Sequence, residues 1–125
     1  MLEYKIRRTG DVTILDLEGR ISLVDALWSA SGVVLGKEIR ELVKKGERKI
    51  LLNLKGVTFI DSSGIGELMG ALTSVHRQGG ELKLVNPTPR VIDLLRITRA
   101  DTMFDIRDDE NSAIQAFSSR LAAAG

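Results

Sequence analysis

The sequence contains no cysteine and only one histidine. Without cysteine the chain can form no disulfide, and it has no thiolate for metal binding or nucleophilic attack. A single histidine with no cysteine beside it also rules out the cysteine–histidine zinc sites of small domains. We therefore expect the protein to use neither a metal nor a cofactor.

The chain also lacks an excess of one charge and a long apolar run. Its 18 basic and 17 acidic residues nearly cancel, whereas binding to a nucleic acid backbone needs a clear basic excess. No apolar stretch approaches the roughly 18 residues that indicate a membrane span, and residues 1–5 lack the apolar core of a signal peptide. We expect a soluble cytoplasmic protein with no direct nucleic acid contact and no membrane insertion.

The length and pattern of the chain indicate one ordinary domain. A chain of 125 residues is long enough to bury a hydrophobic core. No internal repeat, low-complexity tract or linker divides it. We therefore treat residues 1–125 as a single domain.

Two strands are predicted near the beginning of the chain. They cover residues 3–8 and 12–18, and the short connection between them favours an antiparallel hairpin. Apolar side chains lie on both faces of the second strand, for example Ile14 on one face and Leu15 on the other. This strand is therefore expected to be covered on both sides.

Strands alternate with helices after the hairpin, which indicates an α/β layer with a mixed sheet. The antiparallel hairpin forms the edge of the sheet, and about four helices lie chiefly on one face. Residues 21–32 are the least clear part of the chain, and they fit either a loop or an irregular turn. The further predicted strands are 49–54, 81–85 and 103–106, and the predicted helices are 35–45, 62–78, 89–97 and 109–123.

The most informative stretch is residues 59–66, Phe-Ile-Asp-Ser-Ser-Gly-Ile-Gly. It follows a buried strand and precedes an amphipathic helix that begins near Ser62, so it places two hydroxyls and a carboxylate at a strand-to-helix corner. The helix N-terminus offers free N–H groups and the positive end of a dipole, which suits an anion. Spacing alone favours an ordinary helix cap. A phosphorylated serine at Ser62 or Ser63 is compatible with that cap.

Five stretches follow one another in an order typical of one known family. They are Gly19-Arg20-Ile21, the strand 50–54, the corner 59–66, and the segments 79–86 and 91–98. With them the chain resembles the STAS family, the sulfate transporter and anti-sigma factor antagonist domains. Within that family it is most similar to the stand-alone bacterial anti-sigma factor antagonists. The resemblance covers nearly all of the chain.

The resemblance implies a regulatory switch with no catalysis by this chain. In the family, the unphosphorylated antagonist binds an anti-sigma factor that is also a serine kinase, and so releases the sigma factor for transcription. The kinase phosphorylates the antagonist, which then dissociates, and a serine phosphatase resets it. The family's phosphate acceptor is the first hydroxyl residue after the aspartate, which here is Ser62, with Ser63 as the second choice.

The resemblance also implies a partner-binding surface around the acceptor serine. Asp61 would orient or help to recognise the serine, and Ser63 and Gly64 would shape the docking surface. Relatives usually carry an acidic residue where this chain has Ser22, and the stretch 20–32 is longer than usual. Both features lie in a region that is expected to touch the partner.

Trp28 allows two interpretations. It either packs beneath the helix at 35–45, or it is exposed and binds the partner, since tryptophan is enriched at binding hot spots. A further departure from the family is Arg99, where relatives tend to have a glycine that caps a helix in the left-handed conformation. An arginine adopts that conformation only at some cost.

Two other function classes remain open at this stage. The chain could be an unphosphorylated STAS subunit of a stress-signalling or lipid-transport complex, which an exposed hydrophobic patch around Trp28 would favour. It could also be a sensor of a small ligand, a nucleotide or a lipid, which a closed apolar pocket would favour. A hydrolase is not supported, because no general base is placed beside Ser62 and we expect His76 to be a boundary or surface residue.

Overall fold

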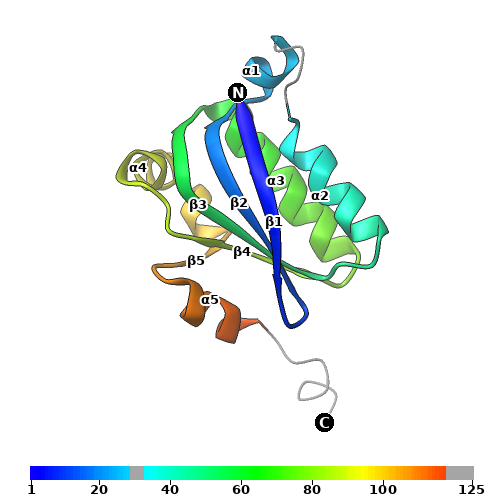
Figure 1. The fold of residues 1–125 in the computed structure, drawn as a ribbon. Coiled ribbons are helices and arrows are strands. Elements are labelled where there is room, and N and C mark those ends of the chain that lie inside the picture. Colours follow the sequence, from blue (N-terminus) through cyan, green and yellow to red (C-terminus); the bar gives the residue numbers. More distant parts are fainter. Residues whose placement is uncertain (29–32, 118–125) are drawn as a thin grey trace.

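The computed structural model describes residues 1–28 and 33–117. These residues form five strands, five α-helices and one 3₁₀ turn (Figure 1). The strands are β1 (Leu2–Thr9), β2 (Val12–Ile21), β3 (Lys49–Ile60), β4 (Glu81–Val85) and β5 (Asp105–Arg107). The helices are α1 (Leu23–Trp28), α2 (Leu35–Lys44), α3 (Ser62–Arg77), α4 (Pro89–Ile97) and α5 (Glu110–Ala116), with the 3₁₀ turn η1 at Ala100–Thr102.

The strands form one mixed sheet in the order β1-β2-β3-β4-β5. β1 and β2 pair antiparallel around a tight turn in which Gly10 has a positive φ of 60°, while the other neighbours pair in parallel. Each parallel connection contains a helix, as crossover connections require. The predicted α/β class and the hairpin at the sheet edge are confirmed.

The main core lies between one face of the sheet and the helices α2, α3 and α4. Its central side chains are fully buried, among them Leu52 of β3, Ile39 of α2, Leu68 of α3 and Leu95 of α4. These helices present apolar side chains at helical spacing, so burial of one stripe holds each helix on the sheet. Helices therefore lie mainly on one face, as predicted.

A smaller core covers part of the opposite face, where only α5 packs among the described helices. This explains why both faces of β2 are apolar. The cluster consists of Val12, Ile14, Leu51, Val85, Ala113 and Phe117.

The strand predicted over 49–54 is six residues longer in the structure. The apolar run ends at Leu54, but β3 continues to pair with β2 as far as the pair Ile21 and Ile60. The pairing contains two register shifts in the second half of β2, which are typical of β-bulges. The extended pairing brings residue 22 next to residue 61, which positions the site described below.

The unclear segment contains the short helix α1, so neither a loop nor an irregular turn describes residues 23–28 correctly. Ser22 precedes α1 and caps it, because its Oγ accepts a hydrogen bond from the Asp25 N–H at 3.1 Å. No residue of α1 is buried, so its sequence carries no core-facing stripe from which a helix could be predicted. The rest of the segment, residues 29–32, lies outside the described residues.

The C-terminal helix is shorter than predicted. A helix over 109–123 was expected, whereas α5 ends at Ala116 and Phe117 is extended with ψ 136°. Ala113 and Phe117 are buried as predicted, while Leu121 lies outside the described residues. The last strand begins at Asp105 rather than Met103, because η1 ends at Thr102 and Met103 is its C-cap residue.

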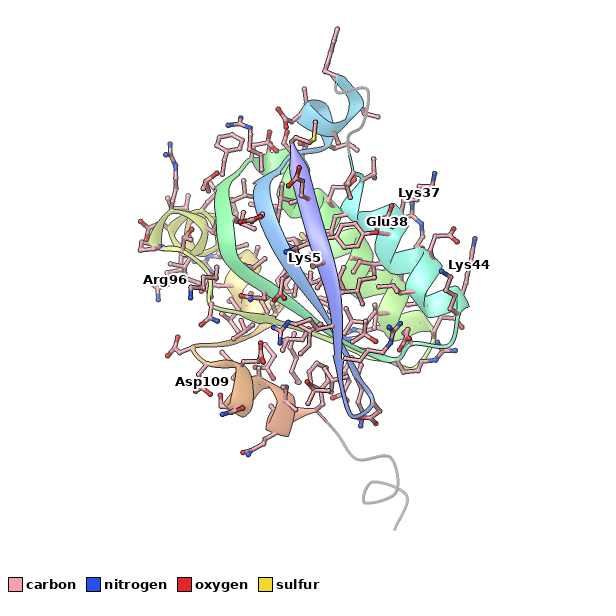
Figure 2. All side chains as sticks on the ribbon, viewed as in Figure 1. Lys5, Lys37, Glu38, Lys44, Arg96 and Asp109 are labelled. Atoms are coloured by element: carbon pink, nitrogen blue, oxygen red, sulfur yellow. The ribbon has the colours of Figure 1, made fainter. Side chains whose placement is uncertain are left out.

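The outer surface of α2 is charged. Figure 2 shows Lys37 and Lys44 projecting away from the sheet and Glu38 on the side that faces β1. Glu38 accepts a 2.7 Å hydrogen bond from the Tyr4 hydroxyl, and this bond is the main reason that the pKa of Tyr4 is raised to about 12. Within the part of the chain that the structure describes, no helix is long and apolar enough to cross a bilayer.

Candidate functional site

The site lies at the corner where β3 ends and α3 begins. Ile60 is buried at the end of β3 and Ile65 is buried in the first turns of α3, so the chain must turn sharply between them. Asp61 is the N-cap residue in an extended conformation, and its Oδ1 accepts a hydrogen bond from the Gly64 N–H at 2.9 Å. The corner is thus an aspartate-capped helix start, as the sequence predicted.

The Asp61 carboxylate is the centre of a hydrogen-bond network. The Ser63 hydroxyl donates to Oδ1 and the Ser22 hydroxyl donates to Oδ2, both at 2.6 Å. Partial burial opposes ionisation of this carboxyl, but the hydrogen bonds from Ser22, Ser63 and Gly64 outweigh it and hold the pKa of Asp61 below its usual range. Asp61 is therefore a carboxylate at neutral pH.

Two of the three serines at the corner have their hydroxyls occupied. Ser22 is buried, with 7% of its surface exposed, and it bonds Asp61 and the Asp25 N–H. Ser63 is half-buried; it donates to Asp61 and accepts from the Leu23 N–H at 2.9 Å. Neither hydroxyl is free to react without losing these bonds.

Ser62 differs from both of them. It is the first residue of α3 and it is exposed, and its hydroxyl makes no hydrogen bond with any residue that the structure describes. It stands at the positive end of a 16-residue helix, where backbone N–H groups attract anions. Ser62 is thus the exposed serine of the corner.

Gly64 allows the close packing of the corner. A Cβ atom at Gly64 would overlap the carbonyl oxygen of Ile21, so the end of β2 lies directly on the first turn of α3. Gly66, by contrast, is exposed and a Cβ there would meet nothing within 4 Å. The fold needs Gly64, whereas nothing in the described structure requires a glycine at position 66.

The structure brings together five of the six residues that the sequence assigned to the site: Ser22, Asp61, Ser62, Ser63 and Gly64. The sixth, Trp28, lies on α1 at the same end of the molecule (Figure 1). It is 87% exposed, so it does not pack beneath α2, and its neighbour Leu27 is 70% exposed.

No pattern in the sequence predicts the hydrogen bond between Ser22 and Asp61, which are 39 positions apart. Only the β2–β3 register brings them together. The Leu23 N–H, which bonds Ser63, was missed for the same reason.

His76 is not part of this site. It is exposed near the far end of α3, about 21 Å from Ser62 at the rise of an α-helix. No histidine base therefore stands beside Ser62, and the corner does not form a hydrolase triad.

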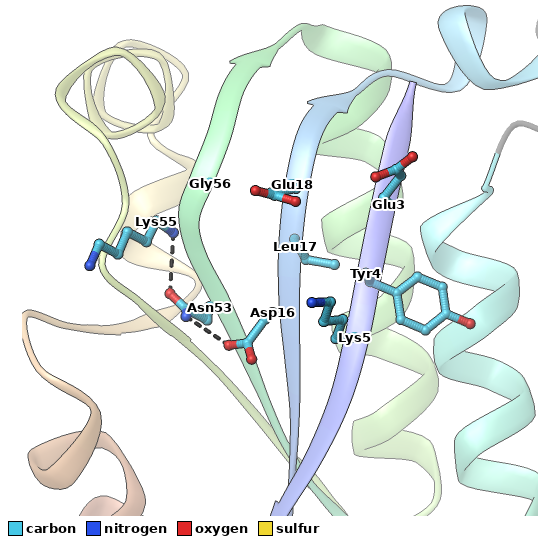
Figure 3. A pocket seen from close by; sticks show the side chains of 9 residues that line it. All are labelled: Glu3, Tyr4, Lys5, Asp16, Leu17, Glu18, Asn53, Lys55 and Gly56. Atoms are coloured by element: carbon cyan, nitrogen blue, oxygen red, sulfur yellow. Dashed lines mark hydrogen bonds between the residues drawn. The ribbon is translucent and has the colours of Figure 1, made fainter.

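A separate concavity of about 550 Å³ lies over β1, β2 and β3 (Figure 3). It is open to solvent, and charged side chains such as Lys5 and Glu18 line it. Asn53 spans part of its floor by donating to Asp16 at 2.8 Å. This concavity does not match the closed apolar pocket expected of a small-ligand sensor.

The comparisons with known proteins agree with this fold. The family model of the STAS domain matches residues 3–113. A protein of Thermotoga neapolitana, provisionally named an anti-sigma factor antagonist, is 39% identical over 120 residues, covering 96% of this chain and 100% of its own. The anti-sigma-B factor antagonist of Bacillus subtilis strain 168 is 34% identical over 85 residues, covering 68% and 77% of the two chains.

A crystal structure extends the similarity to three dimensions. The protein is a provisionally named anti-sigma factor antagonist of Thermotoga maritima, and the two structures superimpose with a TM-score of 0.79 at 27% identity, covering 91% of this chain and 93% of the other. The family model matches most of the chain, and the relative from Thermotoga neapolitana is 39% identical over its whole length. The protein belongs to the STAS domain family, and it is similar to small members that are named anti-sigma factor antagonists.

Proposed function

We propose that this protein is a cytoplasmic anti-sigma factor antagonist that acts by binding and not by catalysis. Its partner is an anti-sigma factor with serine kinase activity, and phosphorylation of Ser62 ends the binding. The names of its relatives support the antagonist role. The observation that carries the switch is the contrast among the corner serines, since Ser62 is exposed and unbonded among the described residues while Ser22 and Ser63 are engaged.

A phosphate on Ser62 fits the corner without a change of fold. It would sit at the first position of α3, where the positive end of the helix dipole favours negative charge. It would add about −1.5 to −2 charges beside the ionised Asp61. The phosphate would therefore block the docking surface by its size and by repulsion of acidic groups on the partner.

The docking surface in this proposal combines the corner with α1. Asp61 and Ser63 orient the backbone around Ser62, and Gly64 keeps the first turn of α3 close to β2. Ser22 contributes through its bond to Asp61, and Trp28 offers an exposed apolar side chain. A serine phosphatase would restore binding by removing the phosphate.

Intact-mass spectrometry after incubation with the cognate anti-sigma factor kinase and ATP tests the acceptor. We expect one added phosphate on the wild type and on Ser74→Ala, a control serine on the same helix, and none on Ser62→Ala. Labelling of Ser62→Ala equal to the wild type would refute the assignment. Loss of the label in Ser63→Ala alone would move the acceptor to the second choice.

Calorimetric binding to the anti-sigma factor tests the switch itself. Ser62→Asp adds a negative charge, and Ser62→Asn is its neutral control of equal size. We expect on the order of a hundredfold weaker binding for Ser62→Asp than for Ser62→Asn, the range measured for unfavourable charges at interfaces. Equal affinities for the two variants would show that charge at this position does not control docking.

The exposed side chains of α1 favour one second candidate. Leu27 and Trp28 would also suit a STAS subunit that docks permanently in a stress-signalling or lipid-transport complex without phosphorylation. In that case the wild type takes up no phosphate, and Trp28→Ala abolishes assembly while Ser62→Ala has no effect.

A further inference from the structure

Helix α1 is attached to the domain in an unusual way. It has six residues, and none of them is buried. Its larger apolar side chains face solvent, with Val24 57%, Leu27 70% and Trp28 87% exposed, while Leu23 and Ala26 are half-buried. A helix this short is not stable by itself in water, and it has no fully buried side chain, so contacts with the rest of the domain must hold it.

Two kinds of contact hold α1: Leu23 and Ala26 line a hollow with residues such as Leu2 and Leu35, and hydrogen bonds that join the start of α1 to α3 converge on the Asp61 carboxylate. Ser22 caps α1 through the Asp25 N–H and donates to Asp61 Oδ2 at 2.6 Å. The first N–H of α1, on Leu23, donates to the Ser63 hydroxyl at 2.9 Å, and Ser63 in turn donates to Asp61 Oδ1. Each carboxylate oxygen therefore receives a hydroxyl that also binds the start of α1.

Among the residues that the structure describes, the other side-chain polar contacts of α1 are exposed ion pairs. The Asp25 carboxylate lies 3.5 Å from the Arg20 guanidinium and 3.0 Å from the amino group of Met1, and all three groups are about a third or more exposed. Such pairs contribute little because water screens them. The network around Asp61 is half-buried or buried, so it is the stronger attachment.

We propose that Ser22, Asp61 and Ser63 form a polar latch that fixes α1 against the N-terminal end of α3. The latch holds Leu27 and Trp28 in one rigid surface with Ser62, so the anti-sigma factor that recognises the serine also covers these two side chains. The latch is the first half of this proposal, and the docking of the anti-sigma factor is the second half, which rests on the proposed function. The three latch residues are positioning residues, because they act through α1.

The continuity of contacts supports a single partner for both features. The bond between Leu23 and Ser63 joins α1 to the residue directly after Ser62. Figure 1 shows α1 and the beginning of α3 at the same end of the molecule. A protein large enough to bring a kinase active site to Ser62 therefore meets α1 as well.

Trp28 gives a direct readout of the latch, because it is the chain's single tryptophan. Time-resolved fluorescence anisotropy of the intact protein measures its local motion without any partner. We expect a larger amplitude of fast depolarisation in Ser63→Ala and Ser22→Ala. Ser63→Thr and Ser22→Thr, which keep the hydroxyl, and Ser74→Ala on the distant part of α3 should match the wild type.

Hydrogen exchange of the Leu23 and Asp25 amides provides a second measurement. Each amide donates to a latch hydroxyl. We expect on the order of tenfold faster exchange at Leu23 in Ser63→Ala and at Asp25 in Ser22→Ala, as loss of one hydrogen bond allows. Unchanged anisotropy and unchanged exchange in both alanine variants would overturn the latch. If one variant does not fold, the other removes the opposite half of the network.

Binding to the anti-sigma factor kinase tests the second half. We expect Ser63→Ala to bind on the order of tenfold more weakly and Ser63→Thr to recover the affinity. Trp28→Ala should weaken binding in the wild type but add little in the Ser63→Ala background, since a loosened α1 no longer presents the side chain. Additive effects would overturn the link between latch and docking. Absence of all kinase binding would contradict the proposed function and leave the anisotropy result valid.

Discussion

At the scale of single residues, the contacts of each serine in the corner decide whether its hydroxyl is free or hydrogen-bonded. The sequence placed the corner correctly, because a strand followed by Asp-Ser-Ser-Gly and a helical stripe is a local pattern. It could not show that Ser63 is engaged and Ser62 is free, because the Leu23 N–H that binds Ser63 comes from a distant segment. The choice of Ser62 over Ser63 as phosphate acceptor came from family resemblance, and it stays a prediction.

Arg99 is a residue whose conformation was foreseen from its departure from the family. It directly follows Thr98, the C-cap residue of α4, and lies in the left-handed region with φ 59° and ψ 14°, which costs a side chain roughly 1–2 kcal/mol. We expect Arg99→Gly to stabilise the protein by about 0.5 kcal/mol after the extra entropy of glycine in the unfolded chain is subtracted. Urea unfolding measures the change.

The neighbouring helical residue supplies the control for this prediction. Arg96→Gly lies inside α4 and should destabilise the protein by about 1 kcal/mol. Equal loss of stability in both variants would show that the backbone at Arg99 is not strained.

At the scale of elements, the first two turns of helix α3 contain both buried residues, such as Ile65, and exposed ones, such as Ser62 and Gly66. Sequence periodicity predicted α3 within one residue and α4 and β4 completely, because each has an apolar pattern that the core uses. It failed for α1, which buries no side chain, and for the second half of β3, where register shifts replace a regular alternation.

Two glycines of α3 should respond oppositely to alanine. Gly66→Ala meets open space and should stabilise the helix by about 0.5–1 kcal/mol. Gly64→Ala meets the Ile21 carbonyl and should cost about 1–3 kcal/mol, the range for overpacking. Denaturant unfolding of the two variants measures the difference.

Kinase assays on the same variants separate the structural role of a glycine from a functional one. If Gly66 is there to keep the surface beside Ser62 low, Gly66→Ala should be phosphorylated more slowly although it is more stable. Gly70→Ala, which also meets open space one turn further from Ser62, is the matched control and should be phosphorylated like the wild type.

At the scale of the whole molecule, ionised carboxylates join distant parts of the chain. Asp105 connects β4 and β5: it lies 2.7 Å from Lys83, which is 7% exposed, and 2.7 Å from Arg107. The hydrogen bond from Arg107, followed by that from Lys83, lowers the pKa of Asp105 to about 2. The pKa values of Asp16 and Glu47 are lowered as well, mainly by hydrogen bonds from Arg7 and Thr13 respectively.

These shifts predict the acid limit of the fold. A carboxyl whose pKa is lower in the folded chain stabilises the fold above its ordinary pKa, here 3.8 for Asp105, and that contribution is lost as the pH falls toward the folded value. We expect stability to drop steeply between about pH 4 and pH 2. Thermal unfolding across this range should show the melting temperature falling as protons are added.

Two variants test how much of this acid-induced loss of stability comes from Asp105. Asp105→Asn leaves the buried Lys83 without its anionic partner, so it should lower stability at pH 7 by about 2–3 kcal/mol and flatten the acid transition. Asp108→Asn removes an exposed acidic side chain nearby and should change stability by less than about 0.5 kcal/mol. Identical pH profiles for Asp105→Asn and the wild type would contradict the role of this carboxylate.

The pairing of Ile21 with Ile60 at the end of the β2–β3 register has a consequence for what a kinase can read. The corner is assembled from segments 39 positions apart, and a peptide containing only residues 55–70 would hold the acceptor serine without Ser22 or α1. Under the proposed function, the surface that a kinase would recognise around Ser62 is therefore discontinuous along the chain. A newly made or misfolded copy would lack that surface, so a phosphate on Ser62 would report on completed folding as well as on signalling.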